Sequence, residues 1–210
     1  MARGVTARWE RADFARPPIA LARALLGQVL VRTLGDGTRM SGRIVEVEAY
    51  LGVRDRAAHS FGGRRTARNA SMYAGPGTAY VYFTYGMHHC VNVVCGREGE
   101  PVAVLIRAIA PVEGIEAMRA HRAGSAKAPR ELNDRVLCAG PARVCQALRI
   151  DRGLDGLDLC ASRELWIERG PAVRRAERSP RIGVAYAREW AERPLRFVDG
   201  SQRNWVSRAR

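Results

Sequence analysis

The sequence predicts an α+β fold: a single compact domain with a mixed, largely antiparallel sheet, a protruding β-hairpin and flanking helices. The length of 210 residues is enough for one substantial hydrophobic core. Hydrophobic residues make up 47% of the chain and charged residues 27%, as in an ordinary globular domain. Segments with strand composition follow one another through short turns, and helical segments flank them. We therefore expect one domain over residues 1–210, with residues 1–12 loosely ordered.

The first elements are a short helix and two strands. Pro17 and Pro18 at the entry and Gly27 at the exit bracket a helix that starts at Ile19. Strand composition and a glycine-containing turn then predict a strand–turn–strand unit at residues 28–34, 35–37 and 41–50.

The strand at residues 41–50 carries the acidic residues of most interest. Side chains alternate across a strand, so one face holds Val45, Val47 and Ala49. The other face then holds Ile44, Glu46, Glu48 and Tyr50.

Residues 51–76 show no periodic pattern and are rich in glycine and arginine. A long irregular loop within a compact domain is usually functional or disordered. Arg64 and Arg65 beside the paired glycines Gly62 and Gly63 suit close approach to a phosphate backbone. The alternative is a solvated, mobile loop.

The rest of the chain supplies most of the sheet. Aromatic and β-branched residues predict a hairpin from strands at residues 80–85 and 89–94, followed by a third antiparallel strand at residues 102–107. Helices are expected at residues 112–121 and 141–148. Short strands are expected at residues 165–168, 182–186 and 194–198, with an Arg/Pro loop at residues 177–181.

The charge balance is strongly basic. Thirty-five Lys and Arg residues against 21 acidic residues give a formal net charge of +14 and a pI near 10.8. Such a field favours polyanionic partners, which are nucleic acids or an anionic membrane surface; the alternative is a solvated basic surface. The N-terminus lacks the apolar core of a signal peptide, and no run of 18 apolar residues occurs. We expect no membrane association and a cytoplasmic location, associated with the nucleoid if the protein is bacterial.

Cysteines and histidines indicate neither a metal site nor a cofactor. The five cysteines are odd in number and form no CxxC pair, so free thiols in a reducing compartment are expected. His88 and His89 are adjacent and point to opposite sides of a strand, so they cannot readily share one metal. Glycine-rich phosphate-binding motifs for nucleotide cofactors are also absent.

Two groups of residues are candidates for chemistry. Glu46 and Glu48 lie two positions apart on a predicted strand, about 6.5–7 Å from each other, and either is a candidate general base. A strand with a solvated face is the alternative, and the pattern does not choose between the two glutamates.

The second group is aromatic. Tyr80, Tyr82 and Tyr85 lie within six residues, and Asn92 and Arg107 lie on the succeeding strands. Aromatic faces stack on nucleic-acid bases, and Asn or Arg can contact base edges. The alternative is that tyrosines are simply favourable strand residues.

These residues stand in a pattern that resembles the alkyladenine (3-methyladenine) DNA glycosylase family. The similarity covers nearly the whole chain in one order. It is carried by residues 42–52, 57–60, 68–69, 76–78, 80–82, 85–87, 92, 105–108, 113–114, 137–141, 193–197 and 205–207.

The resemblance implies a role for each matching residue. Glu48 stands at the position of the catalytic glutamate, which deprotonates the water that attacks C1′ of the deoxyribose. Tyr50, His59 and Tyr82 match the aromatic walls that hold a damaged base flipped out of the duplex. Tyr85 matches the residue at the hairpin tip that wedges into the minor groove.

The remaining matches are polar or basic. Asn92 matches the residue that opposes the exocyclic amine of normal guanine, and Arg107 matches a polar contact that holds the site. Arg64, Arg65 and Met87 are candidates for contacts to the DNA backbone. Glu46 is not a catalytic position in the family and is expected to be supporting or structural. His88, beside the wedge, departs from the bulky residue that is usual there.

The resemblance implies a glycosylase that removes alkylated or deaminated purines from double-stranded DNA. We predict that it is monofunctional and needs no cofactor, and a monomer is the simplest expectation for an enzyme that tracks one duplex. Lys127 is the single lysine, which agrees with water rather than an amine as the nucleophile. Two alternatives are a non-catalytic nucleic-acid-binding module and an enzyme that acts on RNA or free nucleosides.

Overall fold

The computed structural model describes residues 7–84, 86–124 and 132–207. Within them, eight strands form one sheet in the order β3-β4-β5-β2-β1-β6, and β8 pairs with β2 and β7. Every strand pair is antiparallel. The strands are β1 Val29–Thr33, β2 Arg39–Tyr50, β3 Ala79–Thr84, β4 His88–Val94, β5 Ala103–Glu113, β6 Leu165–Glu168, β7 Ala176–Ser179 and β8 Arg196–Asp199. The α+β class is confirmed.

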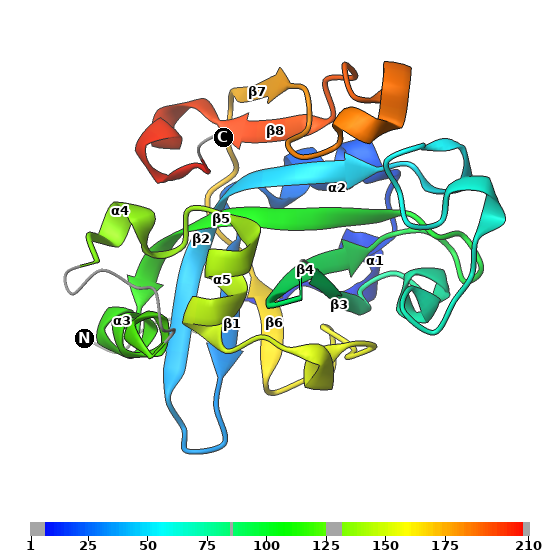
Figure 1. Ribbon diagram of the computed structural model, residues 1–210. Coiled ribbons are helices and arrows are strands. Elements are labelled where there is room, and N and C mark those ends of the chain that lie inside the picture. The colour runs from blue at the N-terminus through cyan, green and yellow to red at the C-terminus, as the bar shows by residue number, and fades with distance from the viewer. Residues whose placement is uncertain (1–6, 85, 125–131, 208–210) are drawn as a thin grey trace.

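Short helices flank the sheet: α5 lies in front of it and α2 behind it in Figure 1. α2 packs against β2 and β5, whereas α5 packs against β4 and β5 and also against α3. The helices are α1 Arg11–Phe14, α2 Pro18–Leu25, α3 Ile115–Ala123, α4 Asp134–Leu137 and α5 Pro141–Leu148. Among described residues, no helix has the length and hydropathy needed to span a bilayer.

The N-terminal helix signals act as the sequence predicts. Pro18 is the first residue of α2, where its missing N–H costs nothing. Gly27, just beyond the helix, has φ +83°, and a Cβ there would lie 2.2 Å from the carbonyl oxygen of Pro171. Only glycine fits this turn. Trp9 is 4% exposed and packs in the core, and residues 1–6 lie outside the described part of the chain, so the loose order of residues 1–12 stays a prediction.

A β-bulge in β2 changes which side chains share a face. Ile44 packs in the main core with Val47, whereas Val45 packs on the other side against Ala108. The expectation that Ile44 shares a face with Glu46 is therefore wrong. The pairing of β2 with β5 shifts register on both sides of Glu46, and this irregularity interrupts the alternation between Ile44 and Val47. The same edge of β2 pairs with β1 before the bulge and with β8 after it.

Two C-terminal expectations are also wrong. Residues 182–186 are not a strand: the segment turns through Gly183 (φ +78°) into the 3₁₀ helix Ala185–Trp190. Residues 177–181 are not simply a loop, because Ala176–Ser179 forms β7 against β8. Among the described strands, β7 pairs only with β8, and such an edge strand tolerates charged residues. The charged composition of this segment is the reason why the sequence did not predict a strand. β5 also runs six residues past its predicted end, through Pro111, which sits opposite Gly42 at a register shift.

Residues 51–76 form the irregular loop that the sequence predicts, with three short 3₁₀ helices: Gly52–Arg54, Phe61–Gly63 and Ala70–Tyr73. The five cysteines are free thiols, as expected: Cys90, Cys95, Cys138 and Cys145 are buried and Cys160 is partly buried.

Candidate active site

The last half of β2 carries two buried carboxylates on the face of the sheet that points away from the main core. Glu46 and Glu48 are each 0% exposed, so the alternative of a solvated strand face is wrong. Their neighbours Val47 and Ala49 point into the main core. The period of two along a strand therefore directs the carboxylates together toward the opposite side.

Glu48 is held by donors from three separate segments. The Tyr50 hydroxyl donates to Oε2 at 2.9 Å, and the backbone N–H of Ile182 donates to Oε1 at 2.8 Å. Nη1 of Arg107, on β5, lies 3.2 Å from the same Oε1. These donors provide hydrogen-bond partners for both oxygens of the Glu48 carboxyl group.

Tyr50 is itself fixed from behind by Arg181. The guanidinium carbon lies 4.7 Å from the centre of the Tyr50 ring, and the Arg181 nitrogens hold Asp55 at 2.6 and 2.8 Å. Burial, with a further contribution from the charge of Glu48, raises the pKa of Tyr50 well above its ordinary value. The phenol therefore stays protonated and donates to Glu48.

Glu46 lies in a separate polar cluster behind Glu48. Its carboxylate accepts hydrogen bonds from Arg107, Arg196 and Ser207. Burial alone would raise the pKa of Glu46, but Arg107, Ser207 and Arg196 together hold it below its ordinary value. Glu46 is thus an ionised carboxylate that pairs with Arg107 and Arg196.

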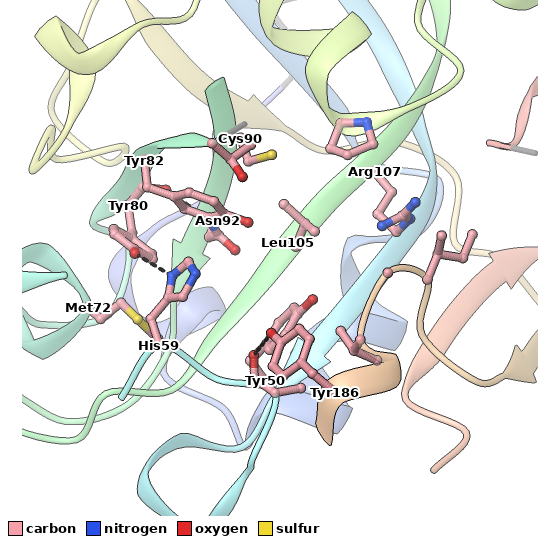
Figure 2. A pocket seen from close by; sticks show the side chains of 16 residues that line it. Tyr50, His59, Met72, Tyr80, Tyr82, Cys90, Asn92, Leu105, Arg107 and Tyr186 are labelled. Carbon is pink, nitrogen blue, oxygen red and sulfur yellow. Dashed lines mark hydrogen bonds between the residues drawn. The ribbon is translucent and has the colours of Figure 1, made fainter. Parts of the chain in front are cut away.

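A cavity of about 370 Å³ opens beside this carboxylate site. Figure 2 shows Tyr80, Tyr82 and His59 gathered on one side of it and Arg107 on the other. Its lining consists of Tyr50, Ala57, His59, Met72, Tyr80, Tyr82, Thr84, Cys90, Asn92, Leu105, Arg107, Pro141, Ile182, Gly183, Val184 and Tyr186. Several aromatic rings and a few polar groups make it a suitable container for a flat heterocycle.

The aromatic wall is rigidly packed. The rings of His59 and Tyr82 meet edge to face at 4.6 Å, and Tyr80 lies 5.3 Å from Tyr82. Nδ1 of His59 is 2.8 Å from the Tyr80 hydroxyl. Burial, with the nearby charge of Arg68, lowers the pKa of His59 to about 4, so its imidazole is neutral near pH 7. The wall can therefore accept a flat ring without adding a positive charge.

Asn92 and Leu105 pair across β4 and β5, which places both at the cavity. The Asn92 side chain is 4% exposed and donates to the carbonyl oxygen of Tyr80 at 3.0 Å. This hydrogen bond fixes its orientation.

The loop that carries His59 is pinned by one buried amide. Asn69 donates to the carbonyl oxygens of His59 at 3.1 Å and Arg64 at 2.9 Å, and it accepts from Thr66. Arg64 and Arg65 are exposed on this loop, the latter with its guanidinium over the Tyr73 ring. The loop is thus organised in its interior and basic on its surface.

A larger groove adjoins the cavity. Its volume is about 1020 Å³, and it shares Arg107, Pro141, Ile182 and Gly183 with the cavity. Three further arginines line it: Arg135, Arg143 and Arg203. It offers a positively charged path that leads to the carboxylate site.

The structure brings together six of the residues singled out from the sequence: Glu48, Tyr50, His59, Tyr82, Asn92 and Arg107. Met87 is 63% exposed in the turn between β3 and β4. Tyr85 and Lys127 lie outside the described residues. No group of three metal-binding side chains occurs among the residues that the structure describes.

Sequence reasoning missed the supports of this site. Asp55, Arg181, Ile182, Arg196 and Ser207 come from distant segments and carry no local motif. Ile182 contributes only its backbone N–H. Because nearly every residue type has this group, the identity of the residue does not indicate the contact. A hint was available for Arg196 and Ser207, since both lie in C-terminal segments that share the family resemblance.

The fold and the site define a class: a protein with a buried, arginine-paired carboxylate beside an aromatic cavity of a shape and lining that suit a flat ring. Comparison with known proteins specifies it further. The chain belongs to the methylpurine-DNA glycosylase (MPG) family, whose model matches residues 12–203. The family resemblance seen in the sequence is confirmed.

Individual relatives agree. The chain is 50% identical over 200 residues to DNA-3-methyladenine glycosylase of Homo sapiens, an alignment that covers 92% of this chain and 66% of that protein. The corresponding protein of Mus musculus is 50% identical over 201 residues, which cover 59% of its length. A putative 3-methyladenine DNA glycosylase of Methanocella arvoryzae is 49% identical over 184 residues, which cover 88% of each chain. The chain thus spans less than two thirds of the two mammalian relatives.

Proposed function

We propose that this chain is a DNA repair glycosylase that flips an alkylated or deaminated purine out of duplex DNA and hydrolyses its N-glycosidic bond. The observation that carries this proposal is the buried Glu48 carboxylate, held by Tyr50, Ile182 and Arg107 beside an aromatic cavity. The family and the names of its relatives support the same chemistry.

In the proposed reaction, Glu48 accepts a proton from a water as that water attacks C1′ of the deoxyribose. A carboxylate offers about four lone-pair positions, and the three donors just named leave Oε2 able to accept from such a water. The C1′–N bond breaks, its electron pair leaves with the base, and an abasic site remains. A cationic N-alkylated purine leaves as a neutral base, whereas a neutral lesion needs a proton.

We propose that the flipped base lies between Tyr50 on one side and His59 and Tyr82 on the other. Stacking of a base on an aromatic ring contributes about 1–3 kcal/mol. A neutral His59 avoids repulsion from a cationic base. Asn92 is proposed to oppose the exocyclic amine of undamaged guanine.

The basic groove and the loop at residues 51–76 are proposed to hold the DNA backbone. Arg64 lines a pocket that shares His59 and Tyr186 with the cavity. Arg65 follows it on the same exposed loop, and the arginine-lined groove adjoins the cavity through Arg107. With a formal net charge of +14, affinity for DNA is expected to fall steeply with salt. Met87 in the hairpin turn is a further backbone candidate, and the wedge role of Tyr85 stays a prediction.

Two further proposals concern the cellular setting. One chain contains the whole proposed site, so we propose that the enzyme acts as a monomer on one duplex. Since its proposed substrate is chromosomal DNA, we propose a cytoplasmic location, associated with the nucleoid if the protein is bacterial.

The test uses duplexes that each carry one defined lesion, incubated with the protein, treated with alkali and sized. We expect strand breaks at one or more damaged purines with the parent chain, and loss of base release with Glu48→Gln, which keeps the shape of the side chain. DNA binding should remain or improve, because a negative charge near phosphates is gone. If Glu48→Gln releases bases at the parental rate, the proposed mechanism is wrong.

A second measurement tests the monofunctional reaction. Incubation with abasic DNA and borohydride traps enzymes that form a Schiff base with a lysine or an amine. We expect no efficient trapping, because water is the proposed nucleophile; an efficiently trapped complex contradicts the proposal.

A further inference from the structure

The cluster behind the proposed catalytic carboxylate joins the second glutamate of β2 to the C-terminal segment at residues 200–207. Glu46 Oε1 accepts hydrogen bonds from Nε of Arg107 at 3.0 Å, Nε of Arg196 at 2.6 Å and Oγ of Ser207 at 2.6 Å. Its Oε2 accepts the backbone N–H of Ser207 at 2.6 Å. Glu46 is 0% exposed and Ser207 is 6% exposed, so solvent screens these contacts little.

Arg107 connects this cluster to Glu48. Its Nε contacts Glu46 at 3.0 Å, its Nη2 donates to Oγ of Ser207 at 3.2 Å, and its Nη1 lies 3.2 Å from Glu48. A guanidinium is planar and rigid, so two nitrogens held in place determine where the third one points. Glu46 and Ser207 occupy the two positions that orient Nη1 toward Glu48.

Charge gives Glu46 a second effect on the site. Glu46 and Glu48 carry two negative charges, and Arg107 and Arg196 carry two positive charges within 3.2 Å of them. Without Glu46, both cations would act on Glu48 alone. An uncompensated cation holds a nearby carboxylate in its charged form and makes it a weaker acceptor of protons.

Stability alone is a poor explanation of this arrangement. Burying charged groups costs several kcal/mol each, and well-packed apolar residues are often as stable as a buried ion pair. Three of the four hydrogen bonds to Glu46 come from Arg107 or from Ser207, which itself binds Arg107. Orientation of Arg107 explains this arrangement better.

We propose that Glu46 and Ser207 are positioning residues that orient the guanidinium of Arg107 toward Glu48, so that the C-terminal segment completes the active site. This inference rests on the proposed function, because Glu48 must be the residue that activates water. Neither positioning residue is assigned contact with the substrate.

The first experiment measures single-turnover base release at saturating protein, together with the dissociation constant for the same lesion-containing duplex. Ser207→Ala removes the hydroxyl that bridges Glu46 and Arg107 and leaves the backbone contact. We expect the rate to fall about tenfold or more, because hydrogen bonds to charged groups are lost, while the dissociation constant stays close to the parental value. Ser207→Thr keeps the hydroxyl and should restore most of the rate.

Ser201→Ala is the matched control. Ser201 lies in the same segment, and its hydroxyl donates to a carboxylate, that of Asp199, at 2.7 Å. It should keep the parental rate. An equal loss of rate in Ser201→Ala and Ser207→Ala would show that the segment matters only for folding and would overturn the inference.

A double-mutant cycle provides the decisive readout. If Ser207 acts through Arg107, Ser207→Ala causes no further loss in an Arg107→Ala background. If the two losses multiply, Ser207 acts independently of Arg107 and the proposal is wrong. Glu46→Gln should also lose rate through Arg107, and it should keep a further loss in the Arg107→Ala background, because the charge of Arg196 then acts on Glu48 without compensation.

The outcome for Glu48→Gln separates the two proposals. Parental activity in Glu48→Gln means that the proposed function of that residue is wrong. An inactive Glu48→Gln beside a fully active Ser207→Ala means that only the inference about positioning is wrong.

Discussion

Asp55 and Arg181, separated by 126 residues in the chain, form a fully buried bidentate ion pair directly behind Tyr50. The two nitrogen–oxygen distances are 2.6 and 2.8 Å, and both side chains are 0% exposed. Arg181 precedes Ile182, whose N–H reaches Glu48, so the pair fixes the segment that delivers this donor. The ion pair thereby connects the stability of the domain to the geometry of the site.

Removal of one partner of this pair is expected to destabilise the domain strongly. Asp55→Ala leaves the Arg181 cation buried without compensation, which typically costs about 3–5 kcal/mol. The free energy of unfolding in denaturant measures this loss. The matched control is Glu189→Ala, which breaks the exposed pair with Arg56 at 3.3 Å and should cost less than about 1 kcal/mol. Equal losses for the two variants would contradict the interpretation.

The hydroxyl of Tyr50 is expected to matter for the reaction beyond the contact area of its ring. Tyr50→Phe keeps the ring and its position over Arg181 but removes the 2.9 Å hydrogen bond to Glu48. Hydrogen bonds to charged groups contribute about 1.5–3 kcal/mol, so we expect single-turnover base release to slow roughly 10- to 100-fold.

Tyr73→Phe is the control for that variant. It removes a hydrogen bond of similar length, 2.8 Å, to the neutral carbonyl of Arg64, and Tyr73 does not line the cavity. Its rate of base release at saturating protein should stay near the parental rate. A Tyr50→Phe variant as fast as Tyr73→Phe would show that the hydroxyl has no part in catalysis.

His59 is expected to make stability depend on pH below neutrality. Burial and Arg68 lower its pKa to about 4 in the folded protein, against an ordinary value of 6.5. Between these values the unfolded chain binds a proton that the folded chain does not, so stability falls as pH decreases from 6.5 to 4. The slope from this residue is at most about 1.4 kcal/mol per pH unit.

The measurement is the free energy of unfolding of the parent and of His59→Gln between pH 7 and pH 4. Carboxylates titrate in both proteins, so the difference between them isolates His59. We expect the stability of the parent relative to the variant to decrease as pH falls. A difference that stays constant over this range would show that His59 is protonated as easily in the folded chain as in the unfolded one.

Asn69 is expected to control the order of the loop that carries His59. Asn69→Ala removes the donors to the carbonyls of His59 and Arg64 and leaves buried polar groups without partners. Trypsin cleaves after arginine, so cleavage at Arg64 and Arg65 should become faster under native conditions. Asn133→Ala, which removes the cap of α4, should leave cleavage at these two sites unchanged. Equal cleavage in Asn69→Ala and the parent would mean that the loop is held by other contacts.

The arginines of the loop are expected to contact DNA phosphates. Arg64→Gln should weaken binding to damaged and undamaged duplexes alike and reduce the slope of log Kobs against log salt by about 1. Arg163→Gln is the control, since Arg163 is exposed beside β6, at the end of the sheet order opposite β3. An unchanged salt slope in Arg64→Gln would remove Arg64 from the DNA interface.

The sequence by itself determined the elements whose signals are local. α2 follows from Pro18 and Gly27, and β3 and β4 follow from runs of aromatic and β-branched residues. Such signals act through the dihedral angles of one or two residues, or through a period of two, so they can be recognised without the rest of the fold. The family resemblance added Glu48, Tyr50, His59, Tyr82, Asn92 and Arg107, and the structure brings all six together.

Only the tertiary structure decided how the two glutamates differ. The pattern of β2 treats Glu46 and Glu48 alike, and strict alternation misplaces Ile44, because a bulge depends on the pairing with β5. Burial, the backbone N–H of Ile182 and the contacts from Arg107, Arg196 and Ser207 come from distant segments. The free energy of an ionised group depends on all charges and dipoles within a few ångströms, whatever their distance along the chain. That environment exists only in the folded protein.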